Sequence, residues 1–143
     1  MWQPVWDYGA LLLTSRNHPL VSHESITPEA LAPYPEVVYG DSAIPHQPLP
    51  RREEADMSRI VVYGRMTQLE LLSRIQDAYM WASPETEAAL RRFGLIQRPC
   101  PESGLRFHDI LIYPAAYTLS QLDCRFIDLL EQARTELIRQ LFP

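Results

Sequence analysis

Short apolar runs alternate along the chain with stretches whose apolar residues recur at helical spacing. The first run, Tyr8 to Thr14, contains three consecutive leucines, which is typical of a strand covered on both faces. Comparable runs predict strands at residues 36–39, 59–65, 78–82, 95–98 and 105–113. Residues 41–58 hold three prolines and a charged run, so we expect an exposed loop there.

Local start signals predict the first helices. Thr27 precedes a proline and an acid, which favours a helix of about one turn that ends before Pro33. Thr67 and Glu70 fit a capping box, in which each side chain bonds the other residue's backbone amide. This pair predicts a helix that runs to about residue 76.

Two later helices complete the pattern. Ser83 precedes a proline and an acid, and predicts a helix that ends at Gly94, a residue suited to a left-handed C-cap. Thr118 is predicted to cap the last helix, whose apolar stripe is Leu119, Leu122, Phe126, Leu129, Leu130, Ala133, Leu137 and Leu141. The alternation of strands and helices predicts an α/β fold, in one domain, with helices on the faces of a largely parallel sheet.

Composition excludes several classes of protein. The net charge is -5, so the chain lacks the basic surface that nonspecific DNA binding requires. No apolar run approaches the ~20 residues that span a bilayer, and the N-terminus does not read as a signal peptide, so we expect a cytoplasmic protein. Its cationic residues are all arginine, which excludes a Schiff-base or P-loop lysine. Cys100 and Cys124 lie far apart, and reduced thiols are expected.

No catalytic or metal-binding motif is present in the sequence. The four histidines and two cysteines show no spacing typical of a metal site. The loop position of His18 favours a structural role, and Cys100 lacks a recognisable base nearby. Trp2 and Trp6 precede the first predicted strand, so we expect them to cover an edge or an interface.

Polar residues follow three of the predicted strands. They are Thr14 with Ser15, Asp41 with Ser42, and Thr67 with Gln68. Ligands of open α/β sheets bind beyond the carboxyl ends of the strands, and a helix N-terminus favours an anion. If the sheet is parallel, these six residues should converge on one binding site.

Four segments, in this order, resemble parts of the effector-binding domain of LysR-type transcription regulators. "YGALLLTSRNHPL" resembles the first strand of the second lobe with its His-Pro-Leu loop, and "ITPEALAPYPEVVYGDS" resembles the helix and strand that follow. "TQLELLSRIQDAYMWASPETEAAL" resembles the next helix, strand and helix. "HDILIYPAAYTLSQLDCRFIDLLEQAR" resembles the strand that crosses back to the first lobe and its terminal helix. One departure is Gln76-Asp77, which replaces a glycine pair of the family.

The resemblance implies a periplasmic-binding-protein-like fold, with lobe two in about residues 1–98 and a return to lobe one in about residues 99–143. It implies a sensor of a small, anionic effector rather than an enzyme, with no cofactor and no metal. The effector contacts would be Thr14, Ser15, Asp41, Ser42, Thr67 and Gln68. The resemblance also implies a homo-oligomer with no membrane contact, which would reach DNA only through an N-terminal domain that this chain lacks.

Three alternatives remain open from the sequence. Asp41 would repel a carboxylate, so an effector with an amine or hydroxyl group is one option. A truncated regulator that only dimerises or binds another protein, with no small ligand, is the second. The resemblance also implies that residues 105–143 would normally complete a sheet of lobe one, so their apolar faces should seek a partner or repack. A small enzyme that uses Cys100 or His18 is the third.

Overall fold

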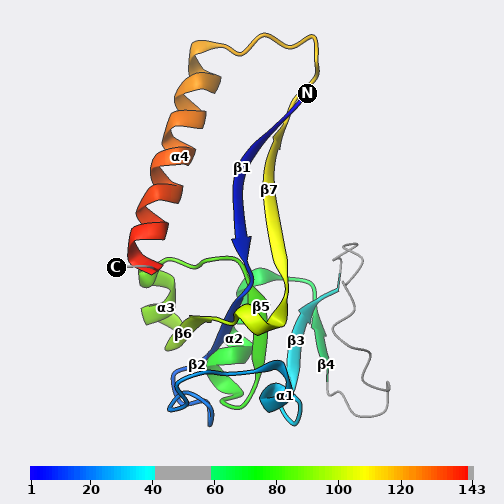
Figure 1. The fold of residues 1–143 in the computed structure, drawn as a ribbon, viewed down its shortest axis with the longest axis vertical. Coiled ribbons are helices and arrows are strands. Elements are labelled where there is room, and N and C mark those ends of the chain that lie inside the picture. Colours follow the sequence, from blue (N-terminus) through cyan, green and yellow to red (C-terminus); the bar gives the residue numbers. More distant parts are fainter. Residues whose placement is uncertain (41–58, 142–143) are drawn as a thin grey trace. The chain divides into compact units, whose positions relative to one another are not determined.

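The computed structural model describes residues 1–40 and 59–141, which form two separate compact units. Unit 1 consists of residues 1–8 and 106–143, and unit 2 consists of residues 9–105. The elements of both units are drawn in Figure 1. The sequence places the boundary between the two parts near residue 98, whereas the contacts divide the chain in two places and assign the N-terminal residues to the same unit as the C-terminal helix.

Unit 2 is a mixed five-stranded sheet with helices. Its strands are β2 (Leu11–Ser15), β3 (Glu36–Tyr39), β4 (Arg59–Val62), β5 (Tyr79–Ala82) and β6 (Leu95–Pro99). Its helices are α1 (Pro28–Leu31), α2 (Arg65–Arg74), α3 (Glu87–Phe93) and the 3-10 turn η1 (Pro101–Ser103). The strand order is β4-β3-β5-β2-β6. The strands of unit 2 were therefore predicted in about the right places, and the α/β class is confirmed.

The prediction of a largely parallel sheet is wrong at β2. Strand β3 pairs in parallel with β4 and β5, but β2 runs antiparallel to both of its neighbours, β5 and β6. The three leucines show that β2 is covered on both faces. A central strand is covered in this way whether it runs parallel or antiparallel to its neighbours, so the apolar pattern does not indicate the direction. Leu11 pairs with Ala82 and Thr14 with Tyr79, so the carboxyl end of β2 lies beside the start of β5.

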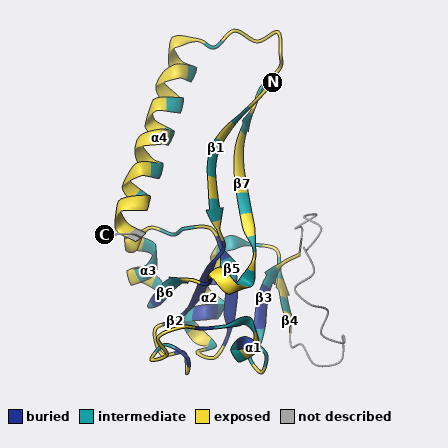
Figure 2. Ribbon diagram, in the orientation of Figure 1, coloured by how far each residue is buried: buried dark blue, intermediate teal, exposed yellow. Residues whose placement is uncertain are grey.

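The two faces of this sheet hold two apolar clusters. One contains Leu13, Met80 and Leu72, the last of which is 0% exposed, and it is formed with α2. The other contains Leu12 and Tyr79 with residues of α1 and the loop before it. Alternate residues of β2 and β5 point to opposite faces, as the strand period requires. Figure 2 shows buried residues gathered on these elements.

Two of the predicted helix boundaries are confirmed. The Thr27 hydroxyl accepts a hydrogen bond from the Ala30 amide at 3.4 Å and caps α1. Gly94 ends α3 with a φ of 64° and a left-handed conformation, which a residue with a Cβ adopts at a cost. Both signals depend only on neighbouring residues, so they can be recognised in the sequence.

The other predicted helix starts are displaced. Helix α2 begins after Gly64, which has no side-chain cap, so Thr67 lies inside its first turn rather than at the N-cap. Helix α3 is capped by Thr86 rather than Ser83. The Thr86 hydroxyl accepts a hydrogen bond from the Ala89 amide at 3.3 Å. The last helix is capped by Ser120 rather than Thr118. For α3 and α4 a second hydroxyl lies two or three residues beyond the predicted cap, and the structure uses this second one. Helix α2 instead begins without a capping side chain.

Unit 1 consists of β1 (Trp2–Gly9), β7 (Arg106–Ile112) and the long helix α4 (Gln121–Leu141). Strands β1 and β7 form a two-stranded sheet, in which Met1 and Tyr113 exchange backbone hydrogen bonds at one end. Strand β1 was missed in the sequence, and Trp2 and Trp6 lie within it rather than before the first strand. The side chain of Asp123 accepts from the Ser120 amide at 2.8 Å, and the Asp123 amide donates to the Ser120 hydroxyl at 3.2 Å.

Among the residues that the structure describes, none in unit 1 is fully buried. The predicted apolar stripe of α4 is present but largely uncovered, since Leu122 is 78% exposed and Phe126 is 55% exposed. Figure 2 shows this contrast with unit 2 in its yellow and teal strands and helix. Two strands and one helix are too few to enclose a core of their own. No helix in the described ranges 1–40 and 59–141 is both long and apolar enough to cross a bilayer.

Candidate functional site

The carboxyl ends of β3, β4 and β5 share one edge of the unit 2 sheet, and α2 begins at this edge. Because β3 is parallel to both β4 and β5, all three strands end there. Gly40 follows β3, and its amide donates to the carbonyl of Val62 at 2.8 Å. A Cβ on Gly40 would lie 2.5 Å from the ring of Tyr63, so the absence of a side chain lets this ring lie against the backbone. We call this region the α2 edge.

Two of the predicted effector contacts lie at the α2 edge. Thr67 is exposed in the first turn of α2, and Gln68 follows it but is only 4% exposed. The first hydrogen bond of the helix runs from the Gln68 amide to the Gly64 carbonyl at 3.0 Å. The backbone amides of residues 65–67 precede this bond and have no side-chain cap, which leaves donors for an anion.

Thr14 and Ser15 do not lie at the α2 edge. The antiparallel direction of β2 places them at the opposite edge of the sheet, so the expected convergence of the six residues does not occur. Both side chains are almost fully buried, and the Ser15 hydroxyl accepts from the Asn17 amide at 3.2 Å in a tight turn. This contact gives Ser15 a role in the loop itself. Asp41 and Ser42 lie outside the described residues.

Sequence reasoning missed an ion pair at the α2 edge. Arg65, the first residue of α2, donates from Nε to the Glu85 carboxylate at 3.1 Å, and a second, shorter bond joins the same two side chains. The Gln97 side-chain amide bonds both the amide and the carbonyl of Glu85, each at 2.9 Å. These residues come from α2, the loop before α3 and strand β6, so no local pattern indicates their contact.

His18 has the structural role that the sequence favours. Its Nδ1 accepts from the Leu20 amide at 3.1 Å, and its Nε2 lies 3.1 Å from the Asp77 carbonyl, to which it donates as the neutral ring. Desolvation lowers the pKa of His18, and the bond to Asp77 opposes this only in part. A histidine that is 3% exposed with both nitrogens bonded to the backbone is not available as a base.

Cys100 is also a poor candidate for chemistry. It is 3% exposed, and its Sγ donates to the Ile26 carbonyl at 3.0 Å. Burial raises the pKa of the Cys100 thiol, which disfavours the reactive thiolate. No cluster of three or more potential metal ligands occurs in the part of the chain that the structure describes. The enzyme alternative therefore loses both of its candidate residues.

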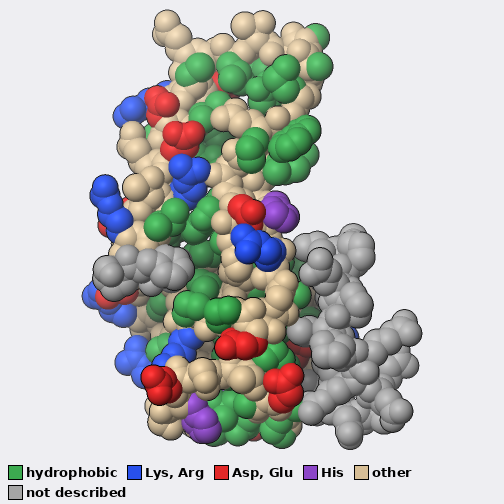
Figure 3. Space-filling model, in the orientation of Figure 1, with side chains coloured by type: hydrophobic (Ala, Val, Ile, Leu, Met, Phe, Trp, Pro, Cys, Tyr) green, Lys and Arg blue, Asp and Glu red, His purple; other side chains and the backbone are tan. Residues whose placement is uncertain are grey.

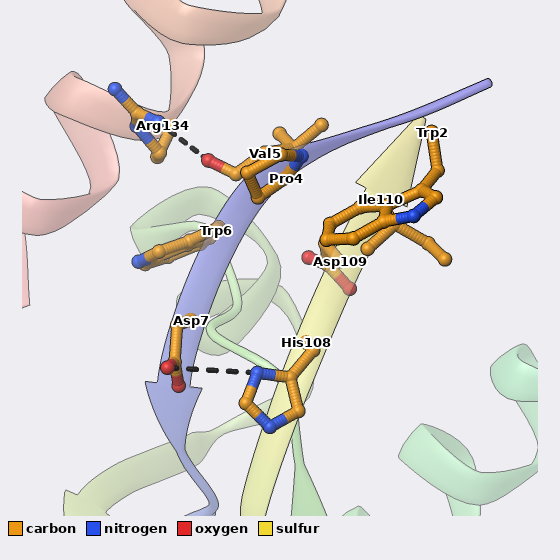
Figure 4. A pocket seen from close by; sticks show the side chains of 9 residues that line it. All are labelled: Trp2, Pro4, Val5, Trp6, Asp7, His108, Asp109, Ile110 and Arg134. Atoms are coloured by element: carbon orange, nitrogen blue, oxygen red, sulfur yellow. Dashed lines mark hydrogen bonds and ion pairs between the residues drawn. The ribbon is translucent and has the colours of Figure 1, made fainter. Parts of the chain in front are cut away.

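Unit 1 carries an open hollow of about 750 Å³ along β1 and β7. Figure 4 shows its lining residues: Trp2, Pro4, Val5, Trp6, Asp7, His108, Asp109, Ile110 and Arg134. Several of its polar groups already contact one another. Asp7 lies 3.1 Å from Arg106 and 3.5 Å from Nδ1 of His108, and Arg134 of α4 donates to the Val5 carbonyl. Figure 3 shows hydrophobic side chains interspersed with acidic and basic ones on the face in view. The unpaired part of the lining is apolar, which favours contact with an apolar surface.

Several solved structures share this arrangement of elements. A protein from Vibrio parahaemolyticus described as a transcriptional regulator superposes with a TM-score of 0.67 at 16% identity, over 97% of this chain and 66% of its own. The regulatory domain of MetR, a LysR family regulator from N. meningitidis, gives 0.57 at 13% identity, over 92% of this chain and 65% of its own. The chain has the fold of part of a LysR-family regulatory domain.

A third similar structure is a regulatory domain that was solved with a bound small molecule. The CcmR regulatory domain from Synechocystis PCC6803, in complex with 2-PG, gives a TM-score of 0.63 at 18% identity, over 93% of this chain and 66% of its own. The chain thus spans just under two thirds of the length of each of these three structures. No protein-family model and no curated protein matches it in sequence.

Proposed function

We propose that this chain is the effector-sensing part of a LysR-type transcription regulator and that it binds a small anionic molecule at the α2 edge. The fold is the observation that carries the proposal, and the complex of the CcmR domain with 2-PG supports a small effector. The uncapped amides of α2 and the nearby Thr67 supply donors for an anion. The protein would act in the cytoplasm as a homo-oligomer and reach DNA through a domain outside this chain.

The effector would work by shifting a population of conformations rather than by catalysis. A ligand that binds one conformation more tightly than another increases the population of the first. The ratio of its affinities for the two conformations limits how far the equilibrium shifts. At the α2 edge the contacts are Thr67 and Gln68, and Asp41 and Ser42 remain part of the proposal. We assign Thr14 and Ser15 to the fold instead, because they lie at the opposite edge of the sheet.

Thermal unfolding with a panel of small carboxylates and phosphates, including 2-PG, tests this function. A ligand that binds only the native state stabilises it by about 2.7 kcal/mol at 100 times its Kd. Thr67→Val should remove this stabilisation. Ser15→Ala should leave it unchanged while it lowers the stability of the free protein by about 1 kcal/mol, the value of one hydrogen bond. If no compound raises the midpoint, the effector function is wrong.

A second candidate function is protein interaction without a small ligand. It is supported by unit 1, whose described residues lack a buried core and whose large apolar side chains, including Trp2, Leu122 and Phe126, are more than half exposed. Contiguous exposed apolar surface is typical of an interface. The thermal-unfolding panel separates the two functions, because only the effector sensor is stabilised by a small molecule. Sedimentation velocity over a range of concentrations tests the self-association that the second function requires. A compact monomer at all concentrations would contradict self-association.

A further inference from the structure

The α2 edge contains a cation whose position is unfavourable without a partner. Arg65 is the first residue of α2, and the positive end of a helix dipole repels a cation. The Glu85 carboxylate offsets this repulsion, because one of its oxygens accepts hydrogen bonds from two nitrogens of the Arg65 guanidinium. The Arg65 side chain remains 37% exposed, so solvent and small solutes can reach it.

Glu85 is held in place by its backbone rather than by its carboxylate. The Gln97 side chain accepts from the Glu85 amide and donates to the Glu85 carbonyl, with both distances at 2.9 Å. Among the described residues, Arg65 is the one side chain that bonds the Glu85 carboxylate. The backbone of Glu85 can therefore stay in position while its carboxylate releases the guanidinium.

Gln68 supplies a second, independent sign that this edge receives a ligand. The residue is 4% exposed, yet within the described ranges its side-chain amide makes no hydrogen bond. The only fully enclosed unpaired side-chain atom in these ranges is Nε1 of Trp81, so the Gln68 amide must reach the surface. Helical spacing places Gln68 on the face of Arg65 and Leu72, and side chains in a helix lean toward its N-terminus. Gln68 therefore lies on the same face of α2 as Arg65, one turn further along the helix.

We propose that Glu85 occupies Arg65 in the ligand-free protein and that the anionic group of the effector displaces it. The effector's carboxylate or phosphate would then accept from the Arg65 guanidinium, from the free amides of the first turn of α2 and from the Gln68 amide. Arginine suits this exchange because its planar donors match both kinds of anion. This inference rests on the proposed function, and it adds Arg65 and Gln68 as anion receptors with Glu85 as their internal competitor.

Inorganic phosphate is the probe that tests the exchange in the full chain. Phosphate affinity is measured by calorimetry at constant ionic strength, in wild type and in Glu85→Gln. Removal of the competitor should tighten phosphate binding by about fivefold, because a partly exposed pair contributes up to about 1 kcal/mol. Arg65→Gln should abolish the binding.

Glu87→Gln is the matched control. Glu87 pairs with Arg91 on the exposed surface of α3, so this variant changes the net charge equally, two residues away, without touching Arg65. Equal tightening in both glutamate variants would show a general charge effect and overturn the inference. A 15N-labelled wild-type protein provides a measurement that does not depend on any variant. Phosphate should shift the Arg65 Nε–H resonance, and an unchanged resonance at saturating phosphate would also overturn it.

The outcomes separate this inference from the proposed function. If a metabolite stabilises the wild type but Glu85→Gln leaves phosphate binding unchanged, the effector function holds and the exchange is wrong. If neither phosphate nor any metabolite binds, both proposals fail.

Discussion

His18 should contribute a large part of the stability of unit 2, and His18→Ala should reveal it. The ring joins the loop after β2 to the turn before β5, two segments separated by 59 positions in the sequence. The centroid of the His18 ring also lies 4.8 Å from the centroid of the Tyr34 ring. Substitution by alanine removes both hydrogen bonds and leaves space where the ring was packed.

The loss in the free energy of unfolding depends on whether the backbone groups that His18 bonds can find another partner. Leu20 is 8% exposed, so its amide would remain buried without an acceptor, at a cost of about 1–3 kcal/mol. Asp77 is exposed, and its carbonyl can bond water, so the second bond is worth about 1 kcal/mol. With the lost packing, we expect a decrease of about 3 kcal/mol in the free energy of unfolding.

The pH dependence gives this prediction a second readout. The pKa of His18 in the folded protein lies below its ordinary value of 6.5, because burial disfavours the charged ring. Below about pH 6.5 the unfolded chain therefore binds more protons than the native state. The stabilisation is complete above this pH and is lost as the pH falls through the folded pKa. In His18→Ala, this part of the pH dependence should disappear.

Urea unfolding followed by circular dichroism, at about pH 7.5 and about pH 5.5, measures both effects. His23→Ala is the control, because His23 is exposed and its substitution should change stability by no more than about 0.5 kcal/mol. A loss of less than about 1 kcal/mol in His18→Ala, or an unchanged pH dependence, would refute the assignment of the ring as a buried, neutral link between the two segments.

Three further predictions concern other parts of the chain. Gly94→Ala should lower the free energy of unfolding by about 1 kcal/mol in the same urea assay, because a Cβ is unfavourable at its φ of 64°; no loss would mean that α3 ends differently. Leu72→Ala should cost about 2–5 kcal/mol, whereas Leu122→Ala should cost less than about 0.5, since these side chains are 0% and 78% exposed. Equal losses would show that α4 is covered in solution. A gel-shift experiment with this polypeptide alone should show no binding to operator DNA. A clean shift would contradict the proposal that this chain senses the effector while another domain binds DNA.

The positions of several elements can be predicted from the sequence because their signals are local. The leucine run of β2 and the capping threonine before α1 act through neighbouring residues, and the structure confirms both. Gly94 is another local signal, because the left-handed backbone at the end of α3 favours glycine at that position. The resemblance of four segments to LysR-type domains is likewise carried by the order of such signals, and the fold agrees with it.

The direction of β2 could be decided only by the tertiary structure, and it determines which residues can form the site. A buried strand has the same apolar pattern in either direction, so the sequence could not show that Thr14 and Ser15 lie away from Thr67. The pairing of Arg65 with Glu85 joins residues 20 positions apart in the sequence. Such contacts depend on how strands and helices pack, and no local propensity encodes them. The local sequence determines where the strands and helices of unit 2 form, because their signals come from neighbouring residues. Tertiary packing decides the direction of β2 and which side chains meet, because those contacts join distant parts of the chain.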